Sequence, residues 1–222
     1  MTDSVLAPVE PDRGSLRDRF FADARRWSLG LLSGRRWRLD LGPITVLRFG
    51  EPQEQATGWT WPIEGGLLAR APGGTLSIRW AEGRLSAHVD GYRPLLPATL
   101  YSLLQLPFHH LTTRLFLLRL RGESPPPGRR AGLERRALAA ALDVGACVLL
   151  SRFRVRRALA VAAVYHVGCW SAFGRTPGEL AAGIRLLALD GSKATPAQAA
   201  VRLLAGDALA ATAMVESRAG RT

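Results

Sequence analysis

The sequence contains almost no lysine and very little cysteine. Lys193 is the only lysine among 30 basic residues, so the net charge of +12 comes almost entirely from arginine. The 2 cysteines, Cys147 and Cys169, provide neither a disulfide framework nor the paired ligand spacing of a zinc site. We therefore expect no metal ion, and we interpret both cysteines as buried thiols.

Catalytic and phosphate-binding motifs are also missing. The sequence has no nucleophile elbow, no phosphate-binding glycine loop and no pair of catalytic carboxylates. Gly65-Gly66 and Gly73-Gly74 lack the strand–loop–helix context that a phosphate loop requires. The neighbours His109 and His110 would point in different directions on a helix, so we expect no shared metal there. The sequence predicts a protein that is not an enzyme and needs no cofactor.

A secretory signal and a long apolar run are absent as well. Residues 1–7 lack a charged start followed by an apolar core, so we expect the N-terminal part to stay in the cytoplasm. The two main apolar segments, 137–150 and 158–174, are short for a spanning helix, which needs about 20 residues. Two interpretations remain open. The segments form a shallow hairpin at the cytoplasmic leaflet, or they pack as a bundle away from lipid.

Arginine is concentrated in clusters that alternate with apolar segments. Clusters at 129–136 and 152–157 flank the first apolar segment. A large positive excess favours anionic partners, and its distribution between apolar segments is more typical of a membrane surface than of one nucleic-acid groove. We expect a lipid bilayer or an anionic lipid surface as the partner, and no nucleic acid.

The N-terminal half is typical of a small α+β domain. Residues 1–13 are polar, and we interpret them as a loose arm before a helix that starts near Ser15. Residues 37–93 contain alternating apolar and polar positions, which predict an antiparallel sheet. A leucine-rich helix over 98–120, interrupted at Pro107, is expected to cover the apolar face of that sheet.

A Pro-rich linker at 122–130 divides the chain. We expect a cytoplasmic α+β domain at 1–121 and a helical membrane domain at 131–215. The predicted fold class is α+β: a small antiparallel sheet covered by helices, followed by an all-α apolar helix pair associated with the membrane. The last part of that domain, from Thr195 to about Met214, is predicted as an Ala-rich helix.

The tryptophans of the predicted sheet have two interpretations. Trp59, Trp61 and Trp80 would line a ligand cleft, or they would fill a small core. The first interpretation leads to an alternative function. On this alternative the protein is a soluble or peripheral, non-enzymatic binding module for an apolar ligand or another partner.

Arg136 and Asp143 are the most informative pair of residues. Seven residues nearly close two helical turns, so both side chains lie on one helix face. A carboxylate inside an apolar helix costs on the order of 3 kcal/mol, so it usually has a partner or a task. Asp143 would bind a cation or a proton with its charge tuned by Arg136, or it would hold the helices together through His166 or Arg185.

Several features of the C-terminal region together resemble a known family. The region begins with an arginine at the start of an apolar helix, an aspartate in the middle of that helix, and a second apolar helix. These are followed by Arg-Thr-Pro-Gly at 175–178 and by Ile-Arg-Leu-Leu-Ala-Leu-Asp-Gly at 184–191. Together, over about 129–205, these features resemble the RDD membrane family. The resemblance implies a membrane protein of unknown molecular function, for which a role in transport is proposed. Glu179 stands where family members usually carry lysine.

The resemblance also implies roles for particular residues. Arg136 would be the family arginine and Asp143 the first, intramembrane aspartate. Asp190 is our candidate for the second aspartate, and Asp207 is the alternative. The functional candidates are therefore Arg136, Asp143, Asp190 and His166, with no catalytic, cofactor-binding or metal-binding residue. Small residues at Ala137, Ala141 and Gly145 recur at every fourth position, which would allow a homo-oligomer to form through that face.

Overall fold

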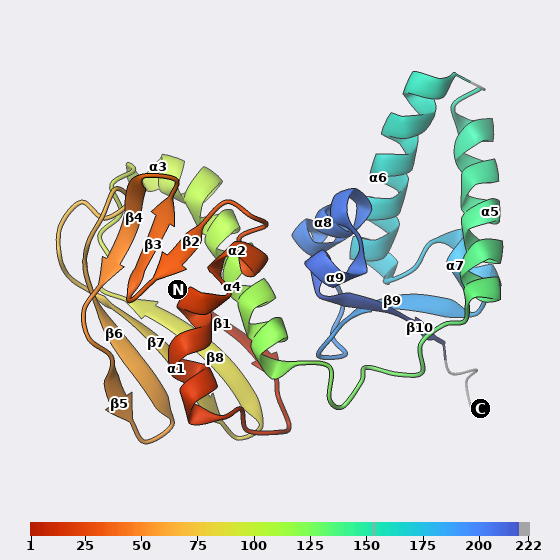
Figure 1. Ribbon diagram of the computed structural model, residues 1–222. Coiled ribbons are helices and arrows are strands. Elements are labelled where there is room, and N and C mark those ends of the chain that lie inside the picture. Colours follow the sequence, from red (N-terminus) through yellow and green to blue (C-terminus); the bar gives the residue numbers. More distant parts are fainter. Residues whose placement is uncertain (153, 218–222) are drawn as a thin grey trace. The chain divides into compact units, whose positions relative to one another are not determined.

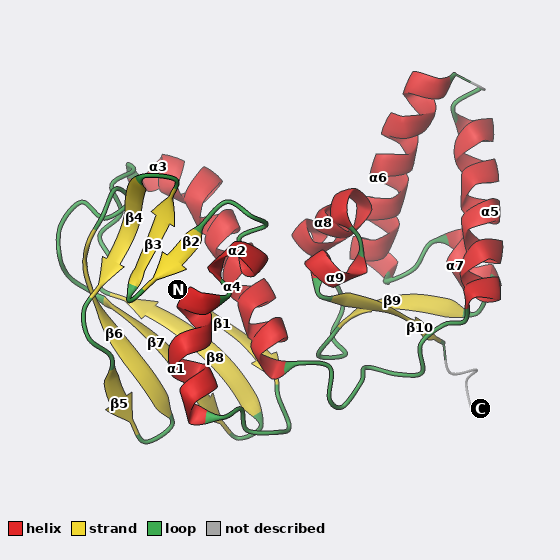
Figure 2. Cartoon of the chain, viewed as in Figure 1, coloured by secondary structure: helices red, strands yellow, loops and turns green. Residues whose placement is uncertain are grey.

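The computed structural model describes residues 1–152 and 154–217 of the chain. The chain forms two compact units, Met1–Ser124 and Pro125–Thr222 (Figure 1). Both units combine helices with strands, as Figure 2 shows by colour. We call them unit 1 and unit 2.

Unit 1 is built on a curled antiparallel sheet. Its strands are β1 (Thr2–Leu6), β2 (Ser33–Arg35), β3 (Arg38–Leu41), β4 (Ile44–Phe49), β5 (Gln53–Gln55), β6 (Gly58–Gly65), β7 (Thr75–Ala81) and β8 (Arg84–Asp90). Their order in the sheet is β1-β8-β7-β6-β4-β3-β2, and β5 pairs with β6. The pairing of β3 with β4 and of β4 with β6 shifts register, and such irregularities bend a sheet.

The N-terminal residues are part of this sheet, so their interpretation as a loose arm was wrong. Strand β1 pairs antiparallel with β8, and Val5 lies opposite Leu85. Val5 is 1% exposed and Leu85 is 0% exposed. Without β1, strand β8 would be an edge strand with unpaired backbone groups. The apolar pair and the backbone ladder therefore outweigh the polar character of the segment.

Helices cover the concave side of the sheet. They are α1 (Arg13–Ala22), α2 (Ala24–Trp27), α3 (Ala98–Leu100), the π-helix η1 (Tyr101–Gln105) and α4 (Leu106–Arg121). Helix α4 packs against β1 and β8, and α1 packs against β2 and β6. The expected interruption at Pro107 takes the form of the π-helical turn, after which proline occupies the first turn of α4. Proline is tolerated there because that position needs no intrahelical N–H bond.

Unit 2 contains a helical hairpin and a small buried sheet. Its elements are α5 (Leu133–Leu150), α6 (Val155–Phe173), α7 (Pro177–Ala181), β9 (Ile184–Ala188), α8 (Pro196–Ala205), α9 (Asp207–Ala210) and β10 (Thr212–Glu216). Strands β9 and β10 pair antiparallel, and their apolar side chains lie in the core with the ends of the hairpin helices. In Figure 1, helices α5 and α6 extend from this base side by side.

Unit 2 is not all-α, which corrects the sequence prediction. The Ala-rich segment from Thr195 does not continue as one helix to Met214. It breaks at Gly206, with φ +84°, and again at Ala211, with φ +51°. Both are left-handed conformations that a helix cannot contain. The residues that follow form β10, in which Met214 pairs with Leu186 of β9.

The hairpin helices bury little of their surface. Helix α5 buries only Ala139, Asp143 and Cys147, which lie four residues apart on one side. Within the described residues, no helix is both long enough and apolar enough to cross a membrane. The structure therefore does not support a transmembrane helix in the described residues. In α5 the charges of Glu134, Arg135 and Asp143 reduce the apolar character.

Candidate functional site

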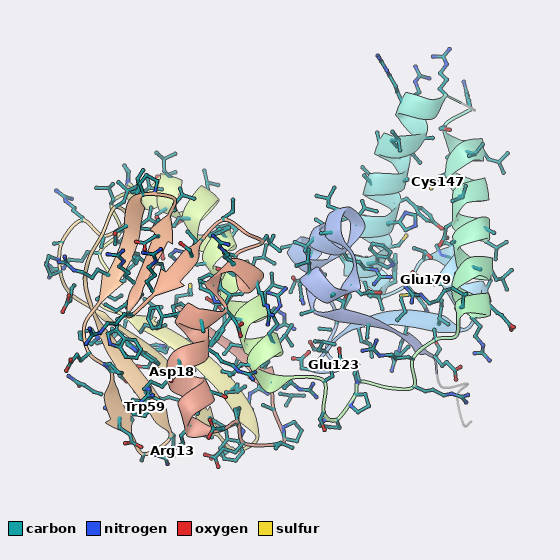
Figure 3. The ribbon with its side chains drawn as sticks, viewed as in Figure 1. Arg13, Asp18, Trp59, Glu123, Cys147 and Glu179 are labelled. Carbon is teal, nitrogen blue, oxygen red and sulfur yellow. The ribbon has the colours of Figure 1, made fainter. Side chains whose placement is uncertain are left out.

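The candidate site of unit 2 surrounds Asp143. Its side chain lies in the middle of α5 and is 3% exposed. It points to the side of α5 that meets α6 and α7. Figure 3 labels Cys147, one helical turn along, and Glu179 of α7 in the same region. The buried carboxylate of α5 therefore lies where three helices meet.

Three donors from two other segments bind this carboxylate. The Tyr165 hydroxyl of α6 donates to Oδ1 over 2.7 Å, and the Gly178 amide donates to the same oxygen over 2.9 Å. The Thr176 hydroxyl donates to Oδ2 over 2.6 Å. An ionised carboxylate has about four acceptor positions, so most of its capacity is used. Asp143 thus connects α5 to α6 and to the start of α7.

The Thr-Pro-Gly sequence explains how α7 approaches so closely. Thr176 caps α7, and Pro177 occupies the first turn, where its missing N–H has no cost. A Cβ atom on Gly178 would lie 2.5 Å from the Ala139 carbonyl oxygen and 2.6 Å from Asp143 Oδ1. Only glycine lets the α7 backbone reach α5 at this distance.

Glu179 completes a second layer of hydrogen bonds. Its side chain is buried and accepts from the Thr176 amide over 2.9 Å, while its own amide donates to Thr176 Oγ1 over 3.1 Å. This reciprocal pair is a capping box. The Trp170 indole N–H also donates to the Glu179 carboxylate, over 2.9 Å. Glu179 therefore has a structural role.

Burial raises the pKa of Glu179, because the charged form loses hydration. The hydrogen bonds from Thr176 and Trp170 and the charge of Arg202 act in the opposite direction and moderate that rise. Burial likewise lowers the pKa of Arg202 to about 10, against the attraction of Glu179. The charge of each group therefore favours the ionised form of the other, which opposes the effect of burial on both pKa values.

Arg136 belongs to a neighbouring ion-pair cluster and not to the Asp143 site. Its Nη2 atom lies 3.3 Å from Asp207 Oδ2. Asp207 also pairs with Arg202 and accepts from the Thr212 hydroxyl. The Arg202 guanidinium in turn stacks over the Trp170 ring, 4.9 Å from its centroid. Arg136 thus lies on the same face of α5 as Asp143 but meets a different carboxylate.

The other two candidates lie outside the first contacts of Asp143. His166 Nδ1 donates to the Ala162 carbonyl within α6, and its ring contacts Tyr165 and Trp170. Asp190 follows β9 and accepts from the Ser192 amide and hydroxyl, which fixes a turn. Within the described residues, no three His, Cys, Asp or Glu side chains are arranged to hold a metal ion.

Sequence reasoning missed most partners of Asp143. Tyr165 was overlooked in favour of its neighbour His166, although a phenol is a natural donor to a buried carboxylate. Thr176 and Gly178 were noted only as part of a family pattern. Cys147 is buried as expected, whereas Cys169 is half-buried. The arrangement has a structural effect. Hydrogen bonds to the buried Asp143 carboxylate hold α5, α6 and α7 together.

A protein family matches the C-terminal part of the chain. The model of the RDD family matches residues 157–214. The C-terminal region carries an RDD-family segment. No curated protein and no solved structure matches the chain.

The RDD segment includes part of the site. Thr176, Gly178 and Glu179 lie within it, together with Asp190 and Asp207. Arg136 and Asp143 precede it. Their assignment as the family arginine and first aspartate therefore stays a prediction. The structure nevertheless connects them to the RDD segment, because the hydrogen-bond partners of Asp143 and the ionic partner of Arg136 all belong to it.

Replacing Glu179 by glutamine should change how the stability of the RDD region depends on pH. The folded-state pKa of Glu179 is raised above its ordinary value of 4.5, so the folded state binds the proton more tightly than the unfolded chain. Wild-type stability should fall as pH rises from that value through the folded pKa, and then become flat. Glu179→Gln should lack this fall and keep the capping box.

Hydrogen exchange of α7 amides between pH 4.5 and pH 8, corrected for intrinsic rates, measures this difference. Glu134→Gln on exposed α5 is the matched control and should retain the wild-type slope. Equal slopes for wild type and Glu179→Gln would contradict the raised pKa.

Proposed function

We propose that the helical hairpin of unit 2 associates with a membrane, its outer apolar sides contacting lipid. The observation that carries this proposal is the exposure of large apolar side chains on both helices. On α5 they include Leu138 (52% exposed), Leu142 (45%), Val144 (60%), Leu149 (68%) and Leu150 (66%), and on α6 Leu159 (70%), Val164 (76%) and Phe173 (76%). A large exposed apolar surface marks an interaction site for lipid or protein.

Positive charge favours lipid over a protein partner. Arg152, Arg154, Arg156 and Arg157 are exposed where α5 ends and α6 begins. Figure 3 shows nitrogen-tipped side chains projecting from this end of the hairpin. Each arginine near an anionic leaflet contributes about 1 kcal/mol. The RDD match supports the same conclusion, because RDD proteins are generally membrane-associated.

A shallow position at the interface suits the hairpin better than a full crossing. Helix α5 has 18 residues and is therefore about 27 Å long. Arginine lies at both of its ends, at 135–136 and 152, so each end would lie among headgroups. We propose a hairpin on the cytoplasmic leaflet, with unit 1 in the cytoplasm. The exposed small residues Ala137, Ala141 and Gly145 would allow two copies to associate there.

In this proposal Asp143 fixes the position of α5 relative to α6, and the outer sides of both helices contact lipid. Three donors from α6 and α7 fix its oxygens, so it positions the helices while their outer sides stay free. Transport is the finer hypothesis. Its support is that two buried carboxyl groups, Asp143 and Glu179, share Thr176. Proton uptake by vesicles that contain wild type or Asp143→Asn would test it, and equal uptake would rule it out.

Leu149→Glu should weaken binding to anionic vesicles about tenfold or more. A charged side chain in the apolar part of a bilayer costs up to about 3 kcal/mol, and each 1.4 kcal/mol is about tenfold. Co-flotation of the full chain with phosphatidylglycerol-containing vesicles measures the change. Leu103→Glu in unit 1 is the matched control, because Leu103 and Leu149 are both 68% exposed.

Only the unit 2 substitution should reduce flotation. Equal flotation of Leu149→Glu and wild type would contradict lipid contact by the hairpin. An alkaline carbonate wash separates the two membrane positions: an interfacial hairpin is released, whereas a spanning one stays with the vesicles.

A further inference from the structure

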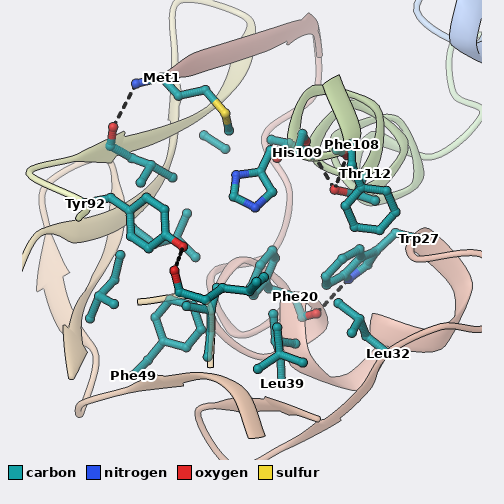
Figure 4. A pocket seen from close by; sticks show the side chains of 18 of the residues that line it. Met1, Phe20, Trp27, Leu32, Leu39, Phe49, Tyr92, Phe108, His109 and Thr112 are labelled. Carbon is teal, nitrogen blue, oxygen red and sulfur yellow. Dashed lines mark hydrogen bonds between the residues drawn. The ribbon is translucent and has the colours of Figure 1, made fainter. Parts of the chain in front are cut away.

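Unit 1 contains a cavity between its sheet and its helices. Its volume is about 320 Å³, within the range of small-molecule pockets. Figure 4 shows side chains converging on it from several elements. The lining comes from α1 and α2, from strands of the curled sheet and from α4; it includes Phe20, Trp27, Leu39, Phe49, Leu76 and Ala87. The apolar lining makes this space suited to an apolar occupant.

The shape of the sheet explains why the space exists. Register shifts between Leu39 and Asp40 and between Arg48 and Phe49 bend the β3–β4–β6 part of the sheet. The sheet therefore curls around the space instead of lying flat against α4. The tryptophans of the sheet do not line the cavity. Trp61 is fully buried in the core, while Trp59 and Trp80 donate to the carbonyls of Arg13 and Ala7. Of the two interpretations of these tryptophans, the structure therefore does not support the ligand cleft, and Trp61 fits the core.

One end of the cavity is polar. Tyr92 and His109 line it, and Gln105, which is 6% exposed, lies behind them. The Tyr92 hydroxyl donates to the Leu68 carbonyl over 2.7 Å. It must therefore accept from the Gln105 amide nitrogen, 3.0 Å away. This fixes the orientation of the Gln105 side chain.

The same network sets the tautomer of His109. The Gln105 amide nitrogen lies 3.3 Å from His109 Nε2 and can only donate, so Nε2 accepts. In the neutral ring the proton then resides on Nδ1. Figure 4 shows the His109 ring pointing into the cavity. The cavity thus receives one oriented N–H donor.

No charged side chain lines the cavity among the described residues. Burial lowers the pKa of His109 to about 4, with the neighbouring His110 acting in the same direction, so the ring is neutral at physiological pH. None of the described lining residues has aspartate, glutamate, lysine or arginine as its side chain. The N-terminal amine of Met1 donates to the Val89 carbonyl. A buried anion would have no charged side chain to pair with, which is costly.

We propose that this cavity is a binding site for a small, neutral, apolar molecule that carries one hydrogen-bond acceptor. The cavity volume of about 320 Å³ lies at the lower end of the range for small-molecule sites, so it suits a compact ligand. The apolar body packs against the aromatic and aliphatic lining, and His109 Nδ1–H donates to the acceptor. The site lies in unit 1 and does not depend on membrane association by unit 2.

A matched pair of probes tests both the apolar and the neutral character of the ligand. 2-Acetylnaphthalene is a neutral ketone, and 2-naphthoate is an anion of the same size and shape. Equilibrium dialysis of the full chain, with the same detergent on both sides, measures what the protein binds. The ketone should bind saturably with one equivalent per chain, and the carboxylate at least tenfold more weakly. Equal or stronger binding of the carboxylate would overturn the proposal.

A variant with a filled cavity separates this site from detergent around the hairpin. Ala87 of β8 is 2% exposed and lines the cavity, so Ala87→Phe places a ring in the space. Saturable binding of the ketone should disappear, while hydrogen exchange of unit 1 stays slow. If Ala87→Phe does not fold, Val89→Phe fills the same cavity from the same strand. Undiminished binding by a folded, filled variant would show that the ketone binds elsewhere.

His109→Phe tests the donor alone. This change keeps the ring and removes the N–H, so 2-acetylnaphthalene should bind roughly fivefold more weakly, the effect of one neutral hydrogen bond. 2-Ethylnaphthalene has no acceptor and should bind wild type and His109→Phe equally. The same loss for both probes would mean that His109 acts by packing and not by donation.

Discussion

Asp143→Ala is expected to lower the stability of the hairpin by about 3–5 kcal/mol, since a buried donor left without its acceptor costs about 1–3 kcal/mol. The substitution removes the acceptor of three donors at once: the Tyr165 hydroxyl, the Thr176 hydroxyl and the Gly178 amide. The site is almost closed to water, because Asp143 is 3% exposed and Thr176 is 1% exposed. Solvent therefore cannot easily replace the lost carboxylate.

Hydrogen exchange of α5, α6 and α7 amides is the appropriate measurement. The two units need not unfold together, so one midpoint for the whole chain would not be meaningful. Unit 1 amides serve as the internal reference and should keep wild-type protection. Asp143→Asn keeps one carbonyl oxygen and should cost less, about 1–2 kcal/mol. Unchanged protection of α7 in Asp143→Ala would contradict the fastening role.

Asp143 itself could be identified from the sequence, but its partners could not. An aspartate inside an apolar segment is conspicuous because of its desolvation cost. Its partners Thr176 and Gly178 lie 33 and 35 residues away, beyond a second helix. Helical periodicity gives the face of a residue and not which loop folds back onto it. This is also why Arg136, on the same face, was a candidate for tuning the charge of Asp143 and instead meets Asp207.

Local structure can be predicted where it depends on a few neighbouring residues. The hairpin of β7 and β8 and the capping box of Thr176 and Glu179 both follow from short-range rules. Strands β1 and β10 were missed, because each is stabilised by a partner distant in sequence. The pairing of Met214 with Leu186 decides that the end of unit 2 is a strand, although its sequence is compatible with a helix.

The cavity of unit 1 could not be located from the sequence either. The sequence identified an apolar sheet face and three tryptophans, but the position of the space depends on where the sheet bends. That bend follows from irregular pairing near Leu39 and Arg48, which no periodic pattern reveals. His109 was expected to take no part in a metal site, and its role as an oriented donor depends on Gln105 and Tyr92.

Gly178→Ala is expected to separate α7 from α5 and to cost about 3 kcal/mol, the upper end of the usual range for overpacking, because the contacted backbone cannot move. The added methyl would meet the Ala139 carbonyl oxygen at 2.5 Å and Asp143 Oδ1 at 2.6 Å. Neither atom is the flexible end of a side chain, because one is helix backbone and the other is held by two hydrogen bonds. The Gly178 N–H···Oδ1 bond and the Thr176 contact should be lost together.

Gly145→Ala on α5 provides the matched control for this prediction. Its added methyl would meet no atom within 4 Å, and alanine favours a helix over glycine by about 1 kcal/mol. The two substitutions make the same chemical change within unit 2 and should shift hydrogen exchange of α5 in opposite directions. The double variant Gly178→Ala/Asp143→Ala should be little less stable than Gly178→Ala alone, because both changes disrupt the same contact. Additive losses would mean that Gly178 and Asp143 act independently, which would refute a single junction at this site.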